Sequence, residues 1–274
     1  MNARIGQKIA FIGAGNMARA ILGGIVKGGL ALPEQCMAAD VSEEQLARLC
    51  KSVGGVATTT DNRRVVEFAD VVIIATKPYH VGAVCEAVAS AARAGQLFVS
   101  ICAGIRTGFI EAKLGGDARV VRVMPNTPAL IGCGASAIAP GSRATPADLA
   151  LVKSLFAAVG TAVEVEEEQL DLVTGLTGSG PAYVFRFAEA LIQAGCELGL
   201  SEAKAKVLVL QTVHGAARMA FESGTPLMEL RQAVTTKGGT TEAGLRVLEE
   251  GDFAELVRDC VARATQRSRE LSGE

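Results

Sequence analysis

Short apolar runs and helical patterns alternate along the first half of the chain. Their order is that of a parallel sheet whose strands are joined by crossover helices. Strands buried on both faces of such a sheet are apolar throughout and do not alternate with polar positions. We expect an N-terminal strand, a helix at residues 43–51, a weak strand at 56–58, and strands at 35–40, 71–75, 97–103, 120–123, 135–139 and 161–165.

The pattern changes at about residue 166, where strand signals stop and long helical patterns begin. Pro181 suits the first turn of one helix, and Ser201 can cap the next. The stretch 252–255 has the form of a capping box that opens a last helix. The pattern therefore predicts an α/β domain at residues 1–165, built on a doubly wound and mostly parallel sheet, followed by an all-α domain at 166–274.

One helical stretch, residues 207–221, is apolar on nearly every face. A helix that is apolar all round is buried, and we expect this one to lie in a subunit interface. The apolar content of 49% suits a large core or an extensive interface. No apolar run approaches the roughly 20 residues that span a bilayer, so we expect no membrane segment.

The charge balance and the cysteines bear on the partners and the compartment of the protein. The 27 basic residues nearly match the 29 acidic residues, and we expect no nucleic-acid partner. The seven cysteines are odd in number and form no C-x-x-C pair, which favours free thiols. Free thiols fit a reducing compartment, and the N-terminus resembles no signal peptide, so we expect a cytoplasmic protein. No spacing of metal ligands stands out.

The first strand ends in a glycine turn that leads into a helix. Gly13 allows a tight turn, and Gly15 removes a side chain where a phosphate must approach the backbone. Backbone N–H groups at the helix N-terminus, around Ala14, Asn16 and Met17, then face negative charge. The sequence therefore predicts dinucleotide binding here, although a Gly-x-Gly pair alone also occurs in ordinary tight turns.

Further cofactor contacts are expected where other strands end. Asp40 follows the second strand, where a carboxylate can accept hydrogen bonds from a ribose 2′-hydroxyl and would repel a 2′-phosphate. The alternative is an aspartate that merely caps a turn or a helix. Lys77 follows the strand at 71–75 and can reach ribose, phosphate or carboxamide, or else be a surface lysine. Asn126 and Thr127, stiffened by flanking prolines, can bond a nicotinamide or simply form a turn.

A second anion site is expected in the helical half. Residues 237–241, Lys-Gly-Gly-Thr-Thr, precede a helical segment. Two glycines free the backbone and two hydroxyls stand at a helix N-terminus, which suits a carboxylate. A capping loop alone would explain one threonine and one glycine, but not all four residues.

Taken together, these motifs resemble 1-pyrroline-5-carboxylate reductase, the last enzyme of proline synthesis. The resemblance covers nearly the whole chain, and its carriers are Phe11–Ala18, Ala75–Pro78, Met124–Pro128, Thr174–Tyr183 and Thr235–Thr241. The last two segments are specific to that family, whereas many dehydrogenases share the first. The resemblance implies a Rossmann-type domain followed by a helical dimerisation domain, a homodimer that often assembles into a decamer, and a composite active site with the glycine–threonine loop from the partner subunit.

The resemblance also implies roles for individual residues. Those that would hold the substrate carboxylate are Gly238, Gly239, Thr240 and Thr241, with the Thr241 hydroxyl near the ring nitrogen as the catalytic contact. Those that would line the coenzyme beyond the glycine turn are Asn62, Ala75, Lys77, Pro78, Ala103 and Asn126.

This chain departs from the family pattern at two places. Many members have Ser-Pro where this chain has Thr236-Lys237, which changes the stiffness and charge of the substrate loop. Where the family contacts the 2′ substituent of the adenosine ribose, this chain has Asp40-Val41 and no basic residue. The usual preference for NADPH is therefore open, and either NADPH or NADH is expected as the coenzyme.

The implied chemistry, reduction of 1-pyrroline-5-carboxylate to L-proline, needs no strong acid. The nitrogen of a cyclic imine can arrive protonated, so the protein has mainly to orient two rings and exclude water. That agrees with a chain of only two histidines, His80 in a loop and His214 in an apolar helix.

Two other classes of protein compete with this interpretation. A β-hydroxyacid dehydrogenase would carry a catalytic lysine and an asparagine in G-x-x-G-x-G-x-x-x-K-x-x-N, but this chain has Val184 and Phe187 there. A dinucleotide sensor without catalysis would have no need of the carboxylate loop. Turnover of pyrroline-5-carboxylate would separate a reductase from a sensor.

Overall fold

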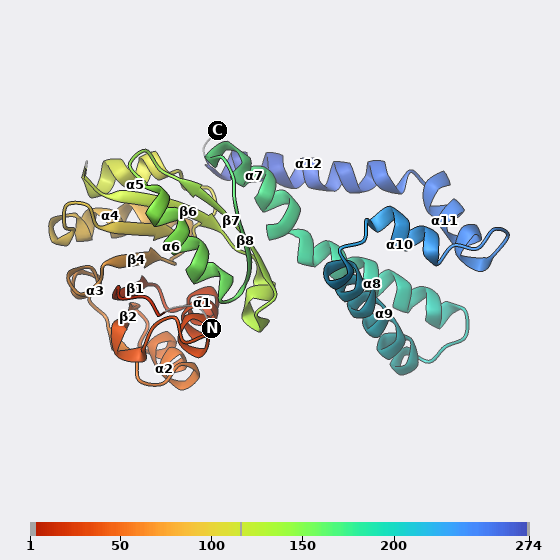
Figure 1. Cartoon of the computed structure of the whole chain (residues 1–274), viewed down its shortest axis with the longest axis horizontal. Coiled ribbons are helices and arrows are strands. Elements are labelled where there is room, and N and C mark those ends of the chain that lie inside the picture. The colour runs from red at the N-terminus through yellow and green to blue at the C-terminus, as the bar shows by residue number, and fades with distance from the viewer. Residues whose placement is uncertain (1–3, 116, 273–274) are drawn as a thin grey trace. The chain divides into compact units, whose positions relative to one another are not determined.

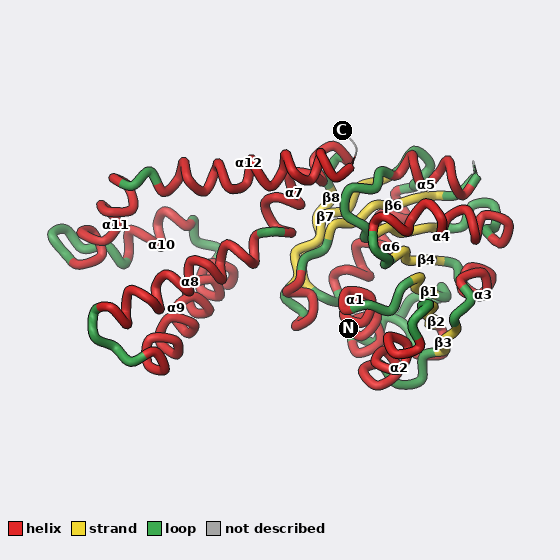
Figure 2. Tube along the Cα trace, turned by 180° about the vertical axis from the view of Figure 1, so that it is seen from behind, coloured by secondary structure: helices red, strands yellow, loops and turns green. Residues whose placement is uncertain are grey.

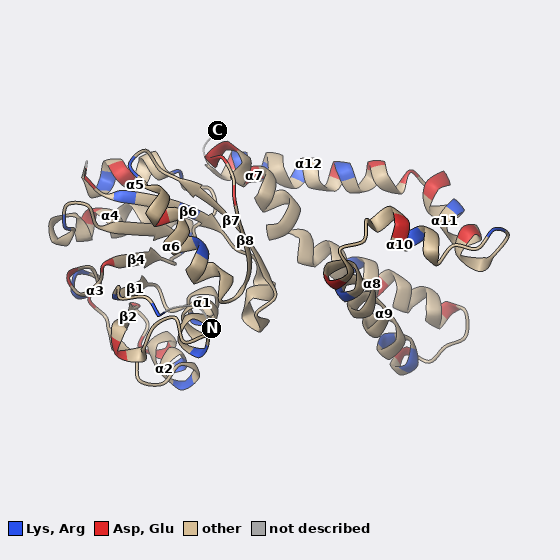
Figure 3. Ribbon diagram, viewed as in Figure 1, with Lys and Arg blue, Asp and Glu red and all other residues tan. Residues whose placement is uncertain are grey.

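The computed structural model describes residues 4–115 and 117–272, which form two compact units. The first unit runs up to Ser179 and takes in the chain again from Arg263 onward, and the second is Gly180–Ala262. In Figure 2 the strands lie in the first unit, and the described part of the second unit is built from helices and loops. Acidic and basic residues are interspersed over both units (Figure 3).

The first unit is built on one eight-stranded sheet with the order β3-β2-β1-β4-β5-β6-β7-β8 (Figure 1). Every neighbouring pair is parallel except β6 and β7, which are antiparallel. The strands are β1 (Ile9–Ile12), β2 (Cys36–Ala39), β3 (Ala57–Thr59), β4 (Val71–Ile74), β5 (Leu97–Ser100), β6 (Arg119–Met124), β7 (Gly134–Pro140) and β8 (Gly160–Glu164).

In the described residues, seven α-helices connect or follow these strands, and five more come after them in the chain. The first set is α1 (Asn16–Lys27), α2 (Glu43–Ser52), α3 (Asn62–Phe68), α4 (Val81–Val88), α5 (Thr107–Leu114), α6 (Pro146–Ala157) and α7 (Leu170–Val173). A π-helical turn, Thr174–Gly178, leads from α7 into the second set. This second set is α8 (Gly180–Glu197), α9 (Glu202–Ser223), α10 (Leu227–Ala233), α11 (Thr240–Glu250) and α12 (Phe253–Ser272).

The sheet is buried on both faces, as the apolar runs predict. Along β1 and β4, Ile9, Phe11 and Ile73 join one core cluster with α1, α2 and α6. The alternating residues Ile12 and Ile74 join a second cluster with α3, α4 and α5. Because side chains alternate between faces, β1 and β4 each supply both cores, and both strands are apolar at every position.

The expected strands and the N-cap positions of two helices are confirmed. All the predicted strands form, with ends that differ by up to a few residues. The Ser42 hydroxyl caps α2 by accepting from the Gln45 N–H at 3.3 Å. Ser201 stands at the N-cap position of α9, but its side chain makes no capping hydrogen bond. The last helix begins at Phe253, as the stretch 252–255 predicts. The capping box itself is wrong, because the Asp252 N–H donates to the Glu249 oxygen and Asp252 has a left-handed φ of 51° where a cap residue is extended.

The end of α12 belongs to the first unit, which the sequence does not predict. The Ser268 hydroxyl donates to the Asp171 carboxylate at 2.5 Å, and both side chains are buried. Ser272 packs against Gly104, in the loop after β5. The chain therefore leaves the first compact unit after Ser179 and re-enters it at Arg263. The domain boundary expected after residue 165 marks the change in sequence pattern, which comes before the end of that unit.

All seven cysteines are free thiols, and three of them are buried in the first unit. Burial raises the pKa of Cys36 and of Cys85 from 9.0 to about 12. The pKa of Cys102 is also raised by burial, although hydrogen bonds to Ser100 and Thr76 oppose the rise. These thiols stay protonated and serve as small apolar groups in the core.

We expect the free energy of unfolding to fall as pH rises above 9. Unfolded thiols ionise near pH 9, whereas Cys36 and Cys85 bind their protons up to about pH 12 in the folded state. The folded state therefore holds more protons in this window, and each thiol lowers stability by up to about 1.4 kcal/mol per pH unit. Urea unfolding at several pH values measures the slope. Cys85→Ala should flatten it and Cys50→Ala, at an exposed position, should not; equal slopes in all three proteins would contradict the account.

Candidate active site

Six neighbouring parallel strands bring the predicted coenzyme residues to one edge of the sheet. Strands β3, β2, β1, β4, β5 and β6 all run the same way, so their carboxyl ends lie together (Figure 1). The chain order reverses at β1, which has β2 on one side and β4 on the other. In doubly wound folds such a reversal opens the ligand crevice at this edge. Each predicted coenzyme residue in the first unit follows or ends one of these strands.

The glycine turn after β1 is packed on one side and open on the other. Gly13 has a φ of 107°, and a Cβ there would lie 2.5 Å from the Ala75 oxygen. A Cβ on Gly15 would meet no atom within 4 Å. Gly13 is therefore needed for the close approach of β1 and β4, whereas Gly15 faces open space at the N-terminus of α1. This arrangement fits a pyrophosphate, which needs N–H groups and room beside them.

Asp40 is bound to the backbone of the same turn. Its carboxylate accepts the Ala14 N–H at 2.7 Å through one oxygen and the Ser42 N–H at 2.9 Å through the other. Asp40 thus joins the end of β2 to the glycine turn, the structural role that the sequence left as an alternative. Val41, which follows it, is 88% exposed.

The loop after β4 carries Ala75, Lys77 and Pro78. The Ala75 N–H donates to the Ile12 oxygen at 2.8 Å, which continues the pairing of β1 and β4 past their ends. Lys77 is exposed. It is the last extended residue after β4, because Pro78 begins a short 3-10 turn. The Cys102 thiol, on the loop after β5, donates to the Thr76 oxygen at 3.2 Å. That contact fixes the loop of Lys77 against the loop that carries Ala103.

Asn126, just after β6, joins two other segments through its side chain. Its side-chain N–H donates to the Thr177 oxygen at 3.1 Å, and its side-chain oxygen accepts the Ala135 N–H at 2.8 Å. It is 9% exposed. Asn126 therefore ties β6 and β7 to the π-helical turn, and it keeps one N–H and one lone pair for a further partner. A Cβ on Gly178 would lie 3.0 Å from the Met124 side chain, so this junction requires a small residue.

Asn62 begins α3, directly after the loop that follows β3. The preceding Asp61 caps the helix by accepting the Arg63 N–H at 2.9 Å. The Asp40 N–H donates to the Thr59 oxygen at 3.3 Å, which joins β2 to β3 at the same edge. Asn62 is half-buried and follows three residues after Thr59.

The glycine–threonine loop lies in the second unit and is a tight turn before α11. The Gly239 N–H donates to the Thr236 oxygen at 2.8 Å, and Gly238 has a φ of 73°. The Gly238 N–H donates to the Glu242 carboxylate at 2.7 Å. Both glycine N–H groups therefore have partners within the chain.

The free donors of this loop come from the threonines. The Ala243 N–H donates to the Gly239 oxygen, so the N–H groups of Thr240 and Thr241 precede the first hydrogen bond of α11. Thr240 is exposed and Thr241 half-buried. Two N–H groups, two hydroxyls and the positive end of the helix dipole can together bind a carboxylate.

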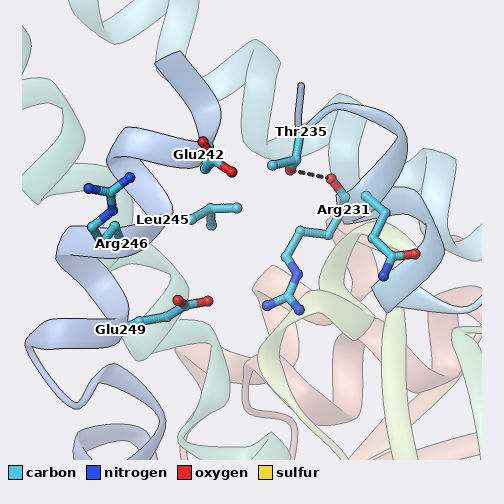
Figure 4. A pocket seen from close by; sticks show the side chains of 7 residues that line it. Arg231, Thr235, Glu242, Leu245, Arg246 and Glu249 are labelled. Atoms are coloured by element: carbon cyan, nitrogen blue, oxygen red, sulfur yellow. Dashed lines mark hydrogen bonds between the residues drawn. The ribbon is translucent and has the colours of Figure 1, made fainter. Parts of the chain in front are cut away.

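A cavity of about 350 Å³ lies beside this loop, between α10 and α11. Figure 4 shows Arg231 and Glu249 reaching towards each other across it, with Leu245 and Glu242 on the α11 side. The Thr235 hydroxyl donates to the Arg231 backbone oxygen at 2.7 Å, which fixes the end of α10. Glu242 thus contacts the glycine–threonine loop from the α11 wall of the cavity.

The histidines and metal ligands add no further site. His80 is exposed in the loop after β4, as expected, and its ring lies 4.3 Å from that of Tyr79. His214 is exposed on α9 in the single chain. Among residues 4–115 and 117–272, no group of three or more His, Cys, Asp and Glu could hold a metal ion, and no helix is long and apolar enough to cross a membrane.

The sequence interpretation missed the contacts of Glu242 and of Asn126. Glu242 stands three residues after the N-cap Gly239, the spacing of a capping box, and that signal was available. The role of Asn126 depends on the Thr177 oxygen, which is 51 residues away in the chain. No local pattern contains that information.

Comparison with known proteins shows which family this chain resembles over its whole length. A family model described as "Pyrroline-5-carboxylate reductase dimerisation" matches residues 167–271, and one described as "NADP oxidoreductase coenzyme F420-dependent" matches residues 8–104. The chain is 42% identical to a pyrroline-5-carboxylate reductase of Methanosarcina acetivorans over 97% of its length and 98% of that protein's. It is also 42% identical to one of Pseudomonas aeruginosa over 97% of both chains.

Solved structures agree with the sequence relatives. A pyrroline-5-carboxylate reductase from Coxiella burnetii matches this structure with a TM-score of 0.93 at 39% sequence identity. The match covers 97% of this chain and 99% of that one. A pyrroline carboxylate reductase from Plasmodium falciparum, solved with NADP bound, has a TM-score of 0.84 at 30% identity, with 98% of this chain and all of that one covered.

Proposed function

This chain belongs to the pyrroline-5-carboxylate reductase family, and we propose how its residues divide the work of that reaction. The enzyme is an oxidoreductase that reduces the cyclic imine 1-pyrroline-5-carboxylate to L-proline with NAD(P)H, in proline biosynthesis. The observation that carries the proposal is the pair of donor sites described above. One is the open glycine turn of the first unit, and the other is the free N-terminus of α11 in the second unit.

We propose that the coenzyme binds at the carboxyl edge of the sheet. Two features of the edge support the fit: the open space at Gly15 and the N–H groups at the start of α1. When bound, a reduced nicotinamide supplies the hydride. In this proposal Asn16 and Met17 hold the pyrophosphate. Lys77 contacts ribose or phosphate, and the remaining N–H of Asn126 faces the carboxamide.

The other predicted residues of this edge shape the groove for the coenzyme. We propose that Ala75, Pro78 and Ala103 form its walls and that Asn62 contacts the adenosine ribose. None of these side chains carries charge, so their part is to exclude water and to keep the rings aligned.

We propose that Thr240 and Thr241 bind the substrate carboxylate with their N–H groups and hydroxyls. The Thr241 hydroxyl then lies near the ring nitrogen and accepts its N–H. The imine reacts as the iminium, so hydride adds to the imine carbon, which becomes C5 of proline, and the nitrogen becomes a neutral secondary amine. No titrating side chain has to supply a proton in that step. Gly238 and Gly239 contribute the shape of the turn.

The dimerisation domain supports self-association, and we propose a homodimer in which each site combines the coenzyme domain of one subunit with the loop of its partner. The exposed apolar side chains of α8 and α9, among them Phe185, Val207 and Leu208, support such an interface, because they would be buried by a second chain. A decamer and a cytoplasmic location remain further proposals, the second supported by the seven free thiols.

We propose that NADH serves this enzyme at least as well as NADPH, and that Asp40 is the reason. The two N–H groups bonded to Asp40 hold its charge at the corner where a 2′-phosphate would lie. Repulsion between two like charges at such distances amounts to about 1–3 kcal/mol near a protein surface. The exposed Val41 beside it offers no compensating cation.

The ratio of kcat/KM for NADH to that for NADPH tests this proposal. Asp40→Asn should lower both values, because an amide cannot accept both backbone N–H groups, and should shift the ratio about tenfold towards NADPH. Glu44→Gln, on the exposed face of α2, is the matched loss of one negative charge and should leave the ratio unchanged. A ratio that stays constant in Asp40→Asn would contradict the assignment.

A further inference from the structure

Glu242 carries a contact that the proposed catalytic scheme does not use. It is the third residue of α11 and half-buried, and its carboxylate accepts the Gly238 N–H at 2.7 Å. In a capping box the glutamate at this position bonds the N–H of the N-cap residue. Here the N-cap is Gly239, whose N–H already donates to Thr236. The Glu242 side chain reaches one residue further and holds the turn itself.

The turn that Glu242 holds has a defined type. The Thr236 oxygen accepts from Gly239, three residues on, and the third residue, Gly238, has a φ of 73°. Lys237, in the second position, is not among the described residues with positive φ. These features make a type II turn, which needs glycine at the third position and favours proline at the second. Family members with Ser-Pro-Gly-Gly therefore have their proline where it stiffens this turn.

This chain has Lys237 in place of that proline, so the second residue of the turn does not restrict the backbone. We infer that Glu242 is a positioning residue, which holds the 236–239 turn in its binding conformation through the Gly238 N–H. Held in this way, the turn directs the N–H groups and hydroxyls of Thr240 and Thr241 at one point. The inference rests on the proposed function of this loop as the carboxylate site. It adds the residue that keeps the loop ordered before substrate arrives.

The test measures KM for pyrroline-5-carboxylate in the full-length enzyme at saturating coenzyme. Glu242→Ala removes the acceptor, and we expect KM to rise tenfold or more while KM for the coenzyme stays within twofold. Glu242→Gln keeps an oxygen that can accept from Gly238, and its KM should stay within threefold of the parent. Glu250→Ala, at the far end of α11 and exposed, is the matched control and should not change KM.

A second variant separates ordering of the turn from any other role of the side chain. Lys237→Pro restricts the turn without Glu242, so Lys237→Pro combined with Glu242→Ala should return KM to within about threefold of the parent. A purely structural role of Glu242 in α11 would not be rescued from position 237. Thermal unfolding and the oligomeric state, measured on each variant, confirm that the proteins compared are folded alike.

Four results would overturn the inference. They are an unchanged KM in Glu242→Ala, an equal rise in Glu242→Gln, no recovery in the double variant, or a fall in KM. The last result would mean that the Glu242 carboxylate competes with substrate for the Gly238 N–H. Thr241→Ala is measured in parallel. If it behaves like the parent, the loop is not the substrate site and the proposed function fails; if it loses activity while Glu242→Ala does not, only the inference about Glu242 fails.

Discussion

Gly15→Ala should weaken coenzyme binding at least a hundredfold and leave the fold intact. Its φ of −68° is accessible to alanine, and the new Cβ would meet no atom of the described chain within 4 Å. The methyl group would project into the space where the pyrophosphate is proposed to lie. We expect the coenzyme KM to rise at least a hundredfold, which corresponds to about 2.7 kcal/mol, with no change in the unfolding midpoint beyond about 2 °C.

Gly13→Ala is the matched variant with the opposite outcome. Its Cβ would lie 2.5 Å from the Ala75 oxygen, and its φ of 107° is strained for any residue with a side chain. We expect a loss of at least about 3 kcal/mol in the free energy of unfolding, because strain and a backbone clash add. Calorimetry and coenzyme titration of both variants check the pair. If Gly15→Ala unfolds as readily as Gly13→Ala, or binds coenzyme as the parent does, the assignment of the turn is wrong.

Thr241→Ala should slow reduction about a hundredfold and leave coenzyme affinity nearly unchanged. The reason is that the Thr241 hydroxyl is proposed to orient the ring nitrogen, and the loss of one well-placed polar contact in a closed site costs about this factor. Thr241→Ser keeps the hydroxyl and should retain most of the activity. Coenzyme affinity, measured by titration in the absence of substrate, separates this effect from a general disturbance.

The opposing result for Thr241 is equally definite. Equal kcat/KM in Thr241→Ala and the parent would remove this residue from the reaction. A parallel loss of coenzyme affinity would mean that the variant disturbs more than the substrate loop. Thr240→Val, next to it and exposed, tests whether the contact belongs to position 241 alone.

The sequence predicts the sheet well because its evidence is local. A run such as Val71–Ile74, apolar at every position, has few alternatives to a strand buried on both faces. The glycine turn is predictable for the same reason, since Gly13 and Gly15 stand between a strand and a helix. The antiparallel placement of β7 is not, because Gly134–Pro140 carries no signal of its direction.

The sequence does not predict the long-range contacts of polar side chains. Asp40 lies where a ribose-reading carboxylate is expected, yet it bonds the Ala14 N–H, 26 residues away. Ser268 and Asp171 are 97 residues apart and meet only because the end of α12 belongs to the first unit, as α7 does. Such partners are chosen by the packing of whole elements, which periodicity and spacing do not encode.

The most direct test of the account is a structure of the assembled enzyme with coenzyme and L-proline bound. We expect the proline carboxylate to accept hydrogen bonds from the N–H groups or hydroxyls of Thr240 and Thr241, with C5 facing the nicotinamide and no histidine, lysine or carboxylate at the ring nitrogen. A proline bound far from the nicotinamide, or touched by no group of residues 238–241, would contradict it.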